Sequence, residues 1–199
     1  MKIAISGAIS TGKTTLGKAL AEEMRVPFIE ENMQPIPVQS PKTIAAGIVS
    51  NLVFKKKLED EAGDFVVDRS PLDMVNFWQA YRLPRKVDNF DIVELGERFT
   101  ADYDFVVITP WGSIPLVGRQ EGEGGAKRVL DEWRQFNGAV RITGLAFHFF
   151  EPAQIIQIPK SLADHDARLN FVLSRIGGRG GPNDVSGGPF GPGIKAGVT

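Results

Sequence analysis

The chain has 199 residues with a net charge of −1 at pH 7, 42% hydrophobic and 24% charged residues, and no cysteine. Length and composition are those of one soluble globular domain that is large enough for a hydrophobic core. The balanced charge gives no general electrostatic reason to expect DNA, RNA or membrane binding. The absence of cysteine excludes disulfides, thiolate metal sites and a cysteine nucleophile, and two histidines are too few for a His-rich zinc site. No run has the length of a transmembrane helix and the amino terminus reads as a strand, not a signal peptide, so we expect a cytoplasmic protein.

Residues 2–16 predict a strand, a glycine-containing loop and the start of a helix. The loop reads Gly7-x-x-x-x-Gly12-Lys13-Thr14, which is the P-loop pattern in its required context. Its backbone N–H groups can surround an anion, while the lysine can reach the β- and γ-phosphates and the threonine hydroxyl can bind Mg²⁺. An ordinary strand-to-helix turn is the weaker alternative, because every part of the pattern occurs in order. The expected nucleotide-binding residues are Gly7, Ala8, Ser10, Thr11, Gly12, Lys13, Thr14 and Thr15.

A pair of acidic residues follows the predicted helix over 14–24 and a short buried strand over 27–29. The strand leads into Glu30 and Glu31, at the carboxyl end where open α/β sheets place their chemistry. Because side chains alternate along a strand, at most one of the two carboxylates should face the site. Two solvated loop acids are an equally good interpretation.

Residues 33–41 form a proline-rich loop, and its last two residues, Ser40 and Pro41, give a typical helix start. We expect this helix to run to about Asp60. Near its predicted end stand three consecutive lysines, Lys55 to Lys57. They most simply complement the helix dipole and stay solvated, with phosphate binding as the less favoured alternative.

The other informative stretch is an apolar strand over 64–68 that delivers Asp68 and Arg69 to its carboxyl end. A carboxylate there can hold the Mg²⁺ shell, and the adjacent arginine can bind a phosphate or fix a catalytic carboxylate. A salt bridge that only positions the turn is the alternative. Pro71 then opens a helix to about Arg82, whose aromatic residues are expected mainly in the core.

The remaining chain predicts further elements of an α/β fold. In order they are a polar linker over 82–91, a helix over 92–101, a strand over 104–109, a helix over 127–150, a strand over 153–158 and a helix over 162–176. Within the 127–150 segment a strand over 139–145 is an alternative, since two glycines weaken the helical pattern.

Two segments should lie outside this framework. Residues 111–128 are rich in glycine and contain Arg119, and such a loop over a nucleotide site commonly serves as a lid; a plain surface loop is the alternative. Residues 177–199 hold glycine, proline and small polar residues with almost nothing to bury, so we expect a flexible tail beside a kinase domain of residues 1–176.

Together these motifs resemble the P-loop kinases of nucleosides and nucleotides, namely the deoxynucleoside and thymidylate kinase group and the neighbouring ribosylnicotinamide-kinase-like ATPases. The resemblance rests on the P-loop, the acidic pair after the second strand, and the sequence VVDRSPLD after the third. It implies that Glu30 or Glu31 is the base-like carboxylate and that Asp68 and Arg69 belong to the second motif. Arg119 would correspond loosely to a lid arginine.

We therefore predict a P-loop three-layer α/β sandwich with a parallel five-stranded sheet and helices on both faces. The predicted activity is transfer of the γ-phosphoryl group of ATP, with Mg²⁺ held by Thr14 and Asp68, to a nucleoside or nucleoside monophosphate. Lys13, Glu30, Glu31, Asp68, Arg69 and Arg119 are the candidate catalytic residues. A polynucleotide or modified-base DNA kinase, and a P-loop ATPase without a small acceptor, are the alternatives, and a homodimer is left open.

Overall fold

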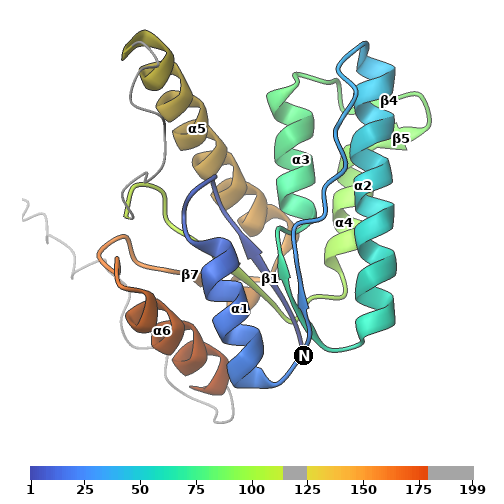
Figure 1. Ribbon diagram of the computed structural model, residues 1–199. Coiled ribbons are helices and arrows are strands. Elements are labelled where there is room, and N and C mark those ends of the chain that lie inside the picture. Colours follow the sequence, from blue (N-terminus) through green and yellow to red (C-terminus); the bar gives the residue numbers. More distant parts are fainter. Residues whose placement is uncertain (114–124, 179–199) are drawn as a thin grey trace, which may run out of the picture.

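A five-stranded sheet forms the centre of the protein (Figure 1). The structure, a computed structural model, describes residues 1–113 and 125–178, and for residues 125–131 only the backbone. The strands run parallel in the order β2-β3-β1-β6-β7. Their bounds are β1 (Lys2–Ser6), β2 (Phe28–Ile29), β3 (Phe65–Asp68), β6 (Phe105–Ile108) and β7 (Ile155–Gln157). The predicted parallel five-stranded sheet is confirmed.

Helices cover both faces of this sheet, which confirms the three-layer sandwich (Figure 1). On one face lie α1 (Lys13–Met24) and α6 (His165–Gly177). On the other lie α2 (Pro41–Ala62), α3 (Pro71–Ala80), α4 (Ile92–Thr100) and α5 (Gly125–Phe149). Alternation along β1 builds the two cores, because Ile3 and Ile5 pack on the α1/α6 side while Ala4 packs on the other.

The strand order decides where a ligand can bind. The chain leaves β1 toward one edge of the sheet for β2 and β3 and returns to its other side for β6, so the direction of winding reverses at β1. In open α/β sheets this switch point, at the carboxyl ends of the strands, is where ligands bind. Ile5 pairs with Asp68, so the register brings the end of β3 beside the loop that follows β1.

Several boundaries differ from the predicted ones. Helix α2 continues to Ala62, so the three lysines stand inside it rather than at its end. The segment predicted as a polar linker holds a small antiparallel hairpin of β4 (Lys86–Val87) and β5 (Phe90–Asp91). A 3₁₀ turn, η1 (Pro152–Gln154), precedes β7. The predicted long helix after the glycine-rich loop is confirmed as α5.

Within the residues that the structure describes, no helix is long and apolar enough to cross a membrane. The predicted lid, apart from its first residues and its carboxyl end, and almost all of the predicted tail lie outside the described residues. Arg119 is in that group.

Candidate functional site

The loop between β1 and α1 has the backbone geometry of an anion cradle. Gly7 has φ 154° and Gly12 has φ 80°, and Ser10 adopts φ 60° between them. A Cβ atom on Gly7 would lie 2.1 Å from Oγ1 of Thr109, so only glycine fits there. Thr11 fixes the other side of the loop, because its hydroxyl donates to the carbonyl of Ala8 at 2.9 Å. The tight loop leads directly into the positive end of α1.

Lys13 lies inside this cradle. Its side chain is buried and Nζ donates a hydrogen bond to the carbonyl oxygen of Ala8 at 2.8 Å. Burial, and secondarily the nearby Arg69 guanidinium, lower the pKa of Lys13. Because burial disfavours the charged ammonium group, the negative charge of an incoming phosphate would stabilise it.

Thr14, in the first turn of α1, lies against Asp68 at the carboxyl end of β3. The hydroxyl of Thr14 donates to one carboxylate oxygen of Asp68. The other oxygen, Oδ1, is buried and has no hydrogen-bond partner in the described part of the chain. An unused anionic oxygen beside a hydroxyl fits Mg²⁺, which usually takes one or two protein oxygens together with substrate phosphates and water. The residues present therefore fit the ion.

Arg69 is the centre of an ion-pair network at the end of β3. Its Nε lies 2.5 Å from Oε1 of Glu31, and Nη1 donates to Oδ1 of Asp73 at 3.2 Å. The second oxygen of Asp73 accepts from the Ser6 hydroxyl and from the backbone N–H of Ser70, each at 2.9 Å. Burial would lower the pKa of Arg69, but the carboxylates of Asp73 and Glu31 outweigh it and raise that pKa. The guanidinium stays charged and is held in one position.

The two predicted acidic residues are placed differently. Glu31 joins Arg69 and lines a pocket of about 260 Å³ over the P-loop. Glu30 pairs instead with Lys18 of α1 at 2.7 Å, and its side chain is 56% exposed. The structure thus brings Glu31 to the P-loop, and it places Glu30 away from it.

The expectation that all three lysines of α2 stay solvated is wrong for Lys55. Its Nζ donates to the backbone carbonyl of Asp68, and burial lowers its pKa. The signal was present in the helical spacing, because Ile48, Leu52, Lys55 and the buried Glu59 follow one another on one face of α2. Lys55 therefore supports the same strand end that carries the predicted magnesium ligand.

Arg168 of α6 is a second residue that the sequence patterns did not indicate. It is 1% exposed, and it donates to the carbonyl of Thr11 at 2.8 Å and to that of Leu162 at 2.7 Å. A further nitrogen donates to the hydroxyl of Ser113, which lies near the start of the glycine-rich segment and is the last described residue before residue 125. Nothing in the local pattern of α6 separates Arg168 from a surface arginine, because its partners come from distant parts of the chain.

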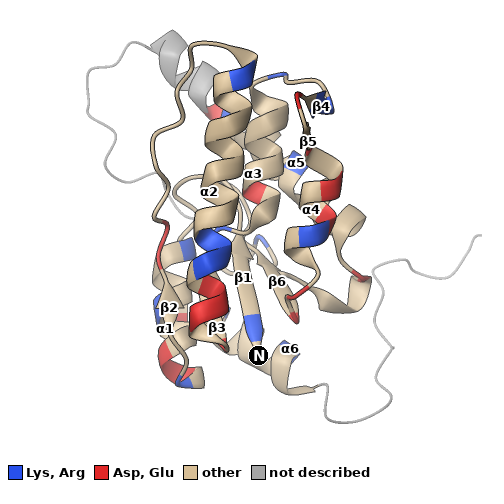
Figure 2. Ribbon diagram, turned by 90° about the vertical axis from the view of Figure 1, so that its right-hand side faces the viewer, with Lys and Arg blue, Asp and Glu red and all other residues tan. Residues whose placement is uncertain are grey.

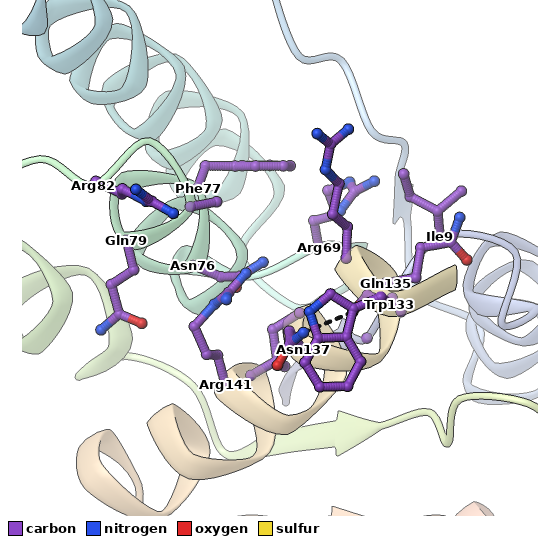
Figure 3. A pocket seen from close by; sticks show the side chains of 16 residues that line it. Ile9, Arg69, Asn76, Phe77, Gln79, Arg82, Trp133, Gln135, Asn137 and Arg141 are labelled. Atoms are coloured by element: carbon purple, nitrogen blue, oxygen red, sulfur yellow. Dashed lines mark hydrogen bonds between the residues drawn. The ribbon is translucent and has the colours of Figure 1, made fainter. Parts of the chain in front are cut away.

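A larger cavity of about 610 Å³ lies beside the P-loop, between α3 and α5 (Figure 3). Phe77 contributes from α3 and Trp133 from α5, and Gly7, Ala8 and Ile9 close the end at the P-loop. Arg69 lines both this cavity and the smaller pocket over the P-loop. The two spaces therefore adjoin at Arg69.

Residues 2–148 match a protein-family model described as an AAA domain. The chain belongs to this AAA-domain family. No curated protein matches it. Among solved structures, a deoxyadenosine kinase from M. mycoides with products dCMP and dCDP bound is 16% identical, with a TM-score of 0.60 over 89% of this chain and 100% of that one.

Two other solved structures are similar in fold. Thymidylate kinase from Candida albicans is 11% identical, with a TM-score of 0.57 over 89% of this chain and 91% of that one. NadR protein in complex with NR is 18% identical, with a TM-score of 0.55 over 92% of this chain and 53% of that one. The predicted resemblance of this AAA-domain protein to the nucleoside and nucleotide kinase group is therefore confirmed in fold.

Proposed function

We propose that this protein is an ATP- and Mg²⁺-dependent kinase that transfers a phosphoryl group to a nucleoside or nucleoside monophosphate. The observation that carries the proposal is the shared wall of the two pockets, where Arg69 stands between the P-loop and the cavity of α3 and α5. A donor held by the P-loop would have its γ-phosphoryl group at this boundary. An acceptor in the larger cavity would approach it from the other side.

Each residue near the boundary has a distinct task in this proposal. Backbone N–H groups of residues 8–15 and the Lys13 ammonium hold the donor phosphates and stabilise the charge that develops on them. Thr14 and Asp68 would hold Mg²⁺, which neutralises phosphate charge when it is bound. In the transfer, a bond forms between the acceptor oxygen and phosphorus while the bond from phosphorus to ADP breaks.

Glu31 is the proposed carboxylate for a hydroxyl acceptor. It lies against the P-loop pocket, and Arg69 fixes its orientation through the 2.5 Å ion pair. A carboxylate in that place can accept the proton of a hydroxyl as the oxygen attacks. We further propose that residues 111–128 are a lid and that Arg119 in this lid closes over the transferring group. Residues 1–176 would then form the kinase domain and residues 177–199 a tail outside it. The proposed location is the cytoplasm.

The test is a panel of acceptors incubated with γ-labelled ATP and Mg²⁺. Nucleosides, nucleoside 5′-monophosphates, ribosylnicotinamide and oligonucleotides are supplied singly, and the labelled product is identified. The turnover of the Lys13→Ala variant should be lower by about 10²-fold or more, since an interaction made with developing phosphate charge commonly contributes about 3 kcal/mol. Lys18→Ala, on the exposed side of the same helix, is the matched control and should keep its turnover. Label released only as inorganic phosphate with every acceptor would contradict a kinase.

A further inference from the structure

The cavity between α3 and α5 has a one-sided charge. In the described part of the chain 16 residues line it; four of these are arginines, Arg69, Arg82, Arg134 and Arg141, and none of the 16 is aspartate or glutamate (Figure 3). The chain as a whole is balanced, with 23 basic and 24 acidic residues. The excess of positive charge is therefore local to this cavity. A pocket of one charge sign concentrates ligands of the opposite sign.

The arginines stand at different distances from the P-loop. Arg69 directly precedes Ser70, the N-cap of α3, and is already engaged with Glu31 and Asp73. Arg82 follows the other end of α3, a ten-residue helix that spans about 15 Å at 1.5 Å per residue. The far part of the cavity thus carries positive charge of its own, separate from the arginine at the transfer boundary.

Arg82 lies past the end of α3, and Arg141 contacts the middle of that helix, so both stand beyond the transfer boundary; we call them the far arginines. Arg141 on α5 donates from Nε to Oδ1 of Asn76 at 2.8 Å, and Asn76 is buried on α3. Arg82 has a left-handed backbone with φ 55°, and its N–H is fixed to the carbonyl of Gln79 at 2.9 Å. Neither Arg82 nor Arg141 pairs with a carboxylate of the described residues. Their guanidinium groups can each offer two parallel N–H donors to an anion.

We propose that the acceptor carries a phosphate group remote from its reacting hydroxyl, and that Arg82 and Arg141 bind this phosphate. This inference rests on the proposed kinase function and specifies its substrate class. Glu31 at the transfer boundary is the proposed proton acceptor for a hydroxyl, so a hydroxyl rather than a phosphate is expected at the reacting end of the acceptor. The far arginines favour an anion at the other end. A deoxynucleoside 3′-monophosphate, phosphorylated on its 5′-hydroxyl, has this arrangement of groups.

The test compares each of the four deoxynucleosides with its 3′-monophosphate and its 5′-monophosphate. Binding to the full-length protein is measured by calorimetry, which needs no turnover, and kcat/KM is measured with labelled ATP. For the accepted base, the 3′-monophosphate should bind about 10- to 100-fold more tightly than the nucleoside, the value of one strong charge-assisted hydrogen bond. Raising the salt concentration should reduce this advantage.

Two variants assign the effect to the far arginines. Arg82→Gln and Arg141→Gln should each remove most of the advantage of the phosphate while changing nucleoside binding less than about threefold. Arg98→Gln on α4, an exposed arginine outside the cavity, makes the same charge change and should leave the advantage intact. Arg141→Lys keeps the positive charge and is the control for any loss of folding that removal of the contact with Asn76 causes. Melting temperatures of all variants are compared with the unaltered protein.

Three results would overturn this inference while leaving the kinase function standing: equal binding of nucleoside and 3′-monophosphate, an advantage that survives in both glutamine variants, or a preference for the 5′-monophosphate. Absence of transfer to every acceptor would instead refute the proposed function. The binding comparison would still decide whether the arginines select a remote phosphate.

Discussion

Replacement of Lys55 by methionine tests whether the end of β3 is held in place from α2. The side chain of Lys55 donates to the Asp68 carbonyl, which is the peptide group directly before Arg69. Arg69 itself has φ 65°, an unfavourable backbone for a residue with a side chain, so the turn depends on its surroundings. Methionine keeps the length and apolar contacts of the lysine but removes the amine. Figure 2 shows a blue, basic segment on the lower half of α2, the helix that carries the three consecutive lysines.

The expected effect follows from the strength of the lost bond. A hydrogen bond from a charged donor contributes about 1.5–3 kcal/mol. If Asp68 and Arg69 need this bond to hold their transfer positions, turnover should fall by about 10- to 150-fold, since each 1.36 kcal/mol is a factor of ten. Stability should change little at pH 7, because the substitution also removes the cost of burying an ammonium group.

The pH dependence supplies a second readout. Burial lowers the pKa of Lys55, so the folded protein gives up this proton at a lower pH than the unfolded chain. Stability should therefore rise with pH between that lowered pKa and the ordinary value of 10.5, and Lys55→Met should lose this contribution.

The assay is steady-state transfer with the acceptor identified from the panel, together with urea unfolding. Lys57→Met is the matched control, since Lys57 is exposed on the same helix and pairs only loosely with Glu61 at 4.0 Å. Equal turnover of Lys55→Met and Lys57→Met would refute the reasoning, and so would a loss that is explained entirely by unfolding.

The remaining predictions concern the carboxylates and the arginine of α6. Glu31→Gln should lower turnover by about 10²-fold with ATP affinity nearly unchanged, whereas Glu30→Gln should be mild; equal effects in a kinetic comparison would contradict a role for Glu31. Arg168→Ala should weaken ATP binding by about tenfold or more, measured by calorimetry in a variant with a checked melting temperature, because the carbonyl of Thr11 loses its partner; unchanged affinity would count against it. Burial raises the pKa of Glu59 above 4.5, so its contribution to stability should fall as pH rises from 4.5 through the raised pKa, and Glu59→Gln should remove that fall in urea unfolding; an unaltered pH profile would disprove the assignment.

Local chemistry explains which parts of the fold could be predicted. The helix starts at Ser40-Pro41 and at Pro71 are predictable because a serine cap and an initial proline act over a few residues; in the structure Ser40 and Ser70 each accept a backbone N–H of the first turn. The β4–β5 hairpin was missed, since its two-residue strands carry no periodicity. The end of α2 was placed too early, because the lysines suggested a helix terminus.

The sequence by itself determined the P-loop, the strand that carries Asp68 and Arg69, and the parallel α/β class. All three depend on residue types at fixed short spacing, which local backbone geometry converts into one structure. Only the tertiary structure decided that Glu31 rather than Glu30 meets Arg69, that Lys55 turns inward, and that Arg168 contacts Thr11 from 157 residues away. These contacts depend on the sheet register and on how helices pack across it, and a pattern read over a few neighbouring residues holds no information about which distant backbone group will lie within hydrogen-bond reach.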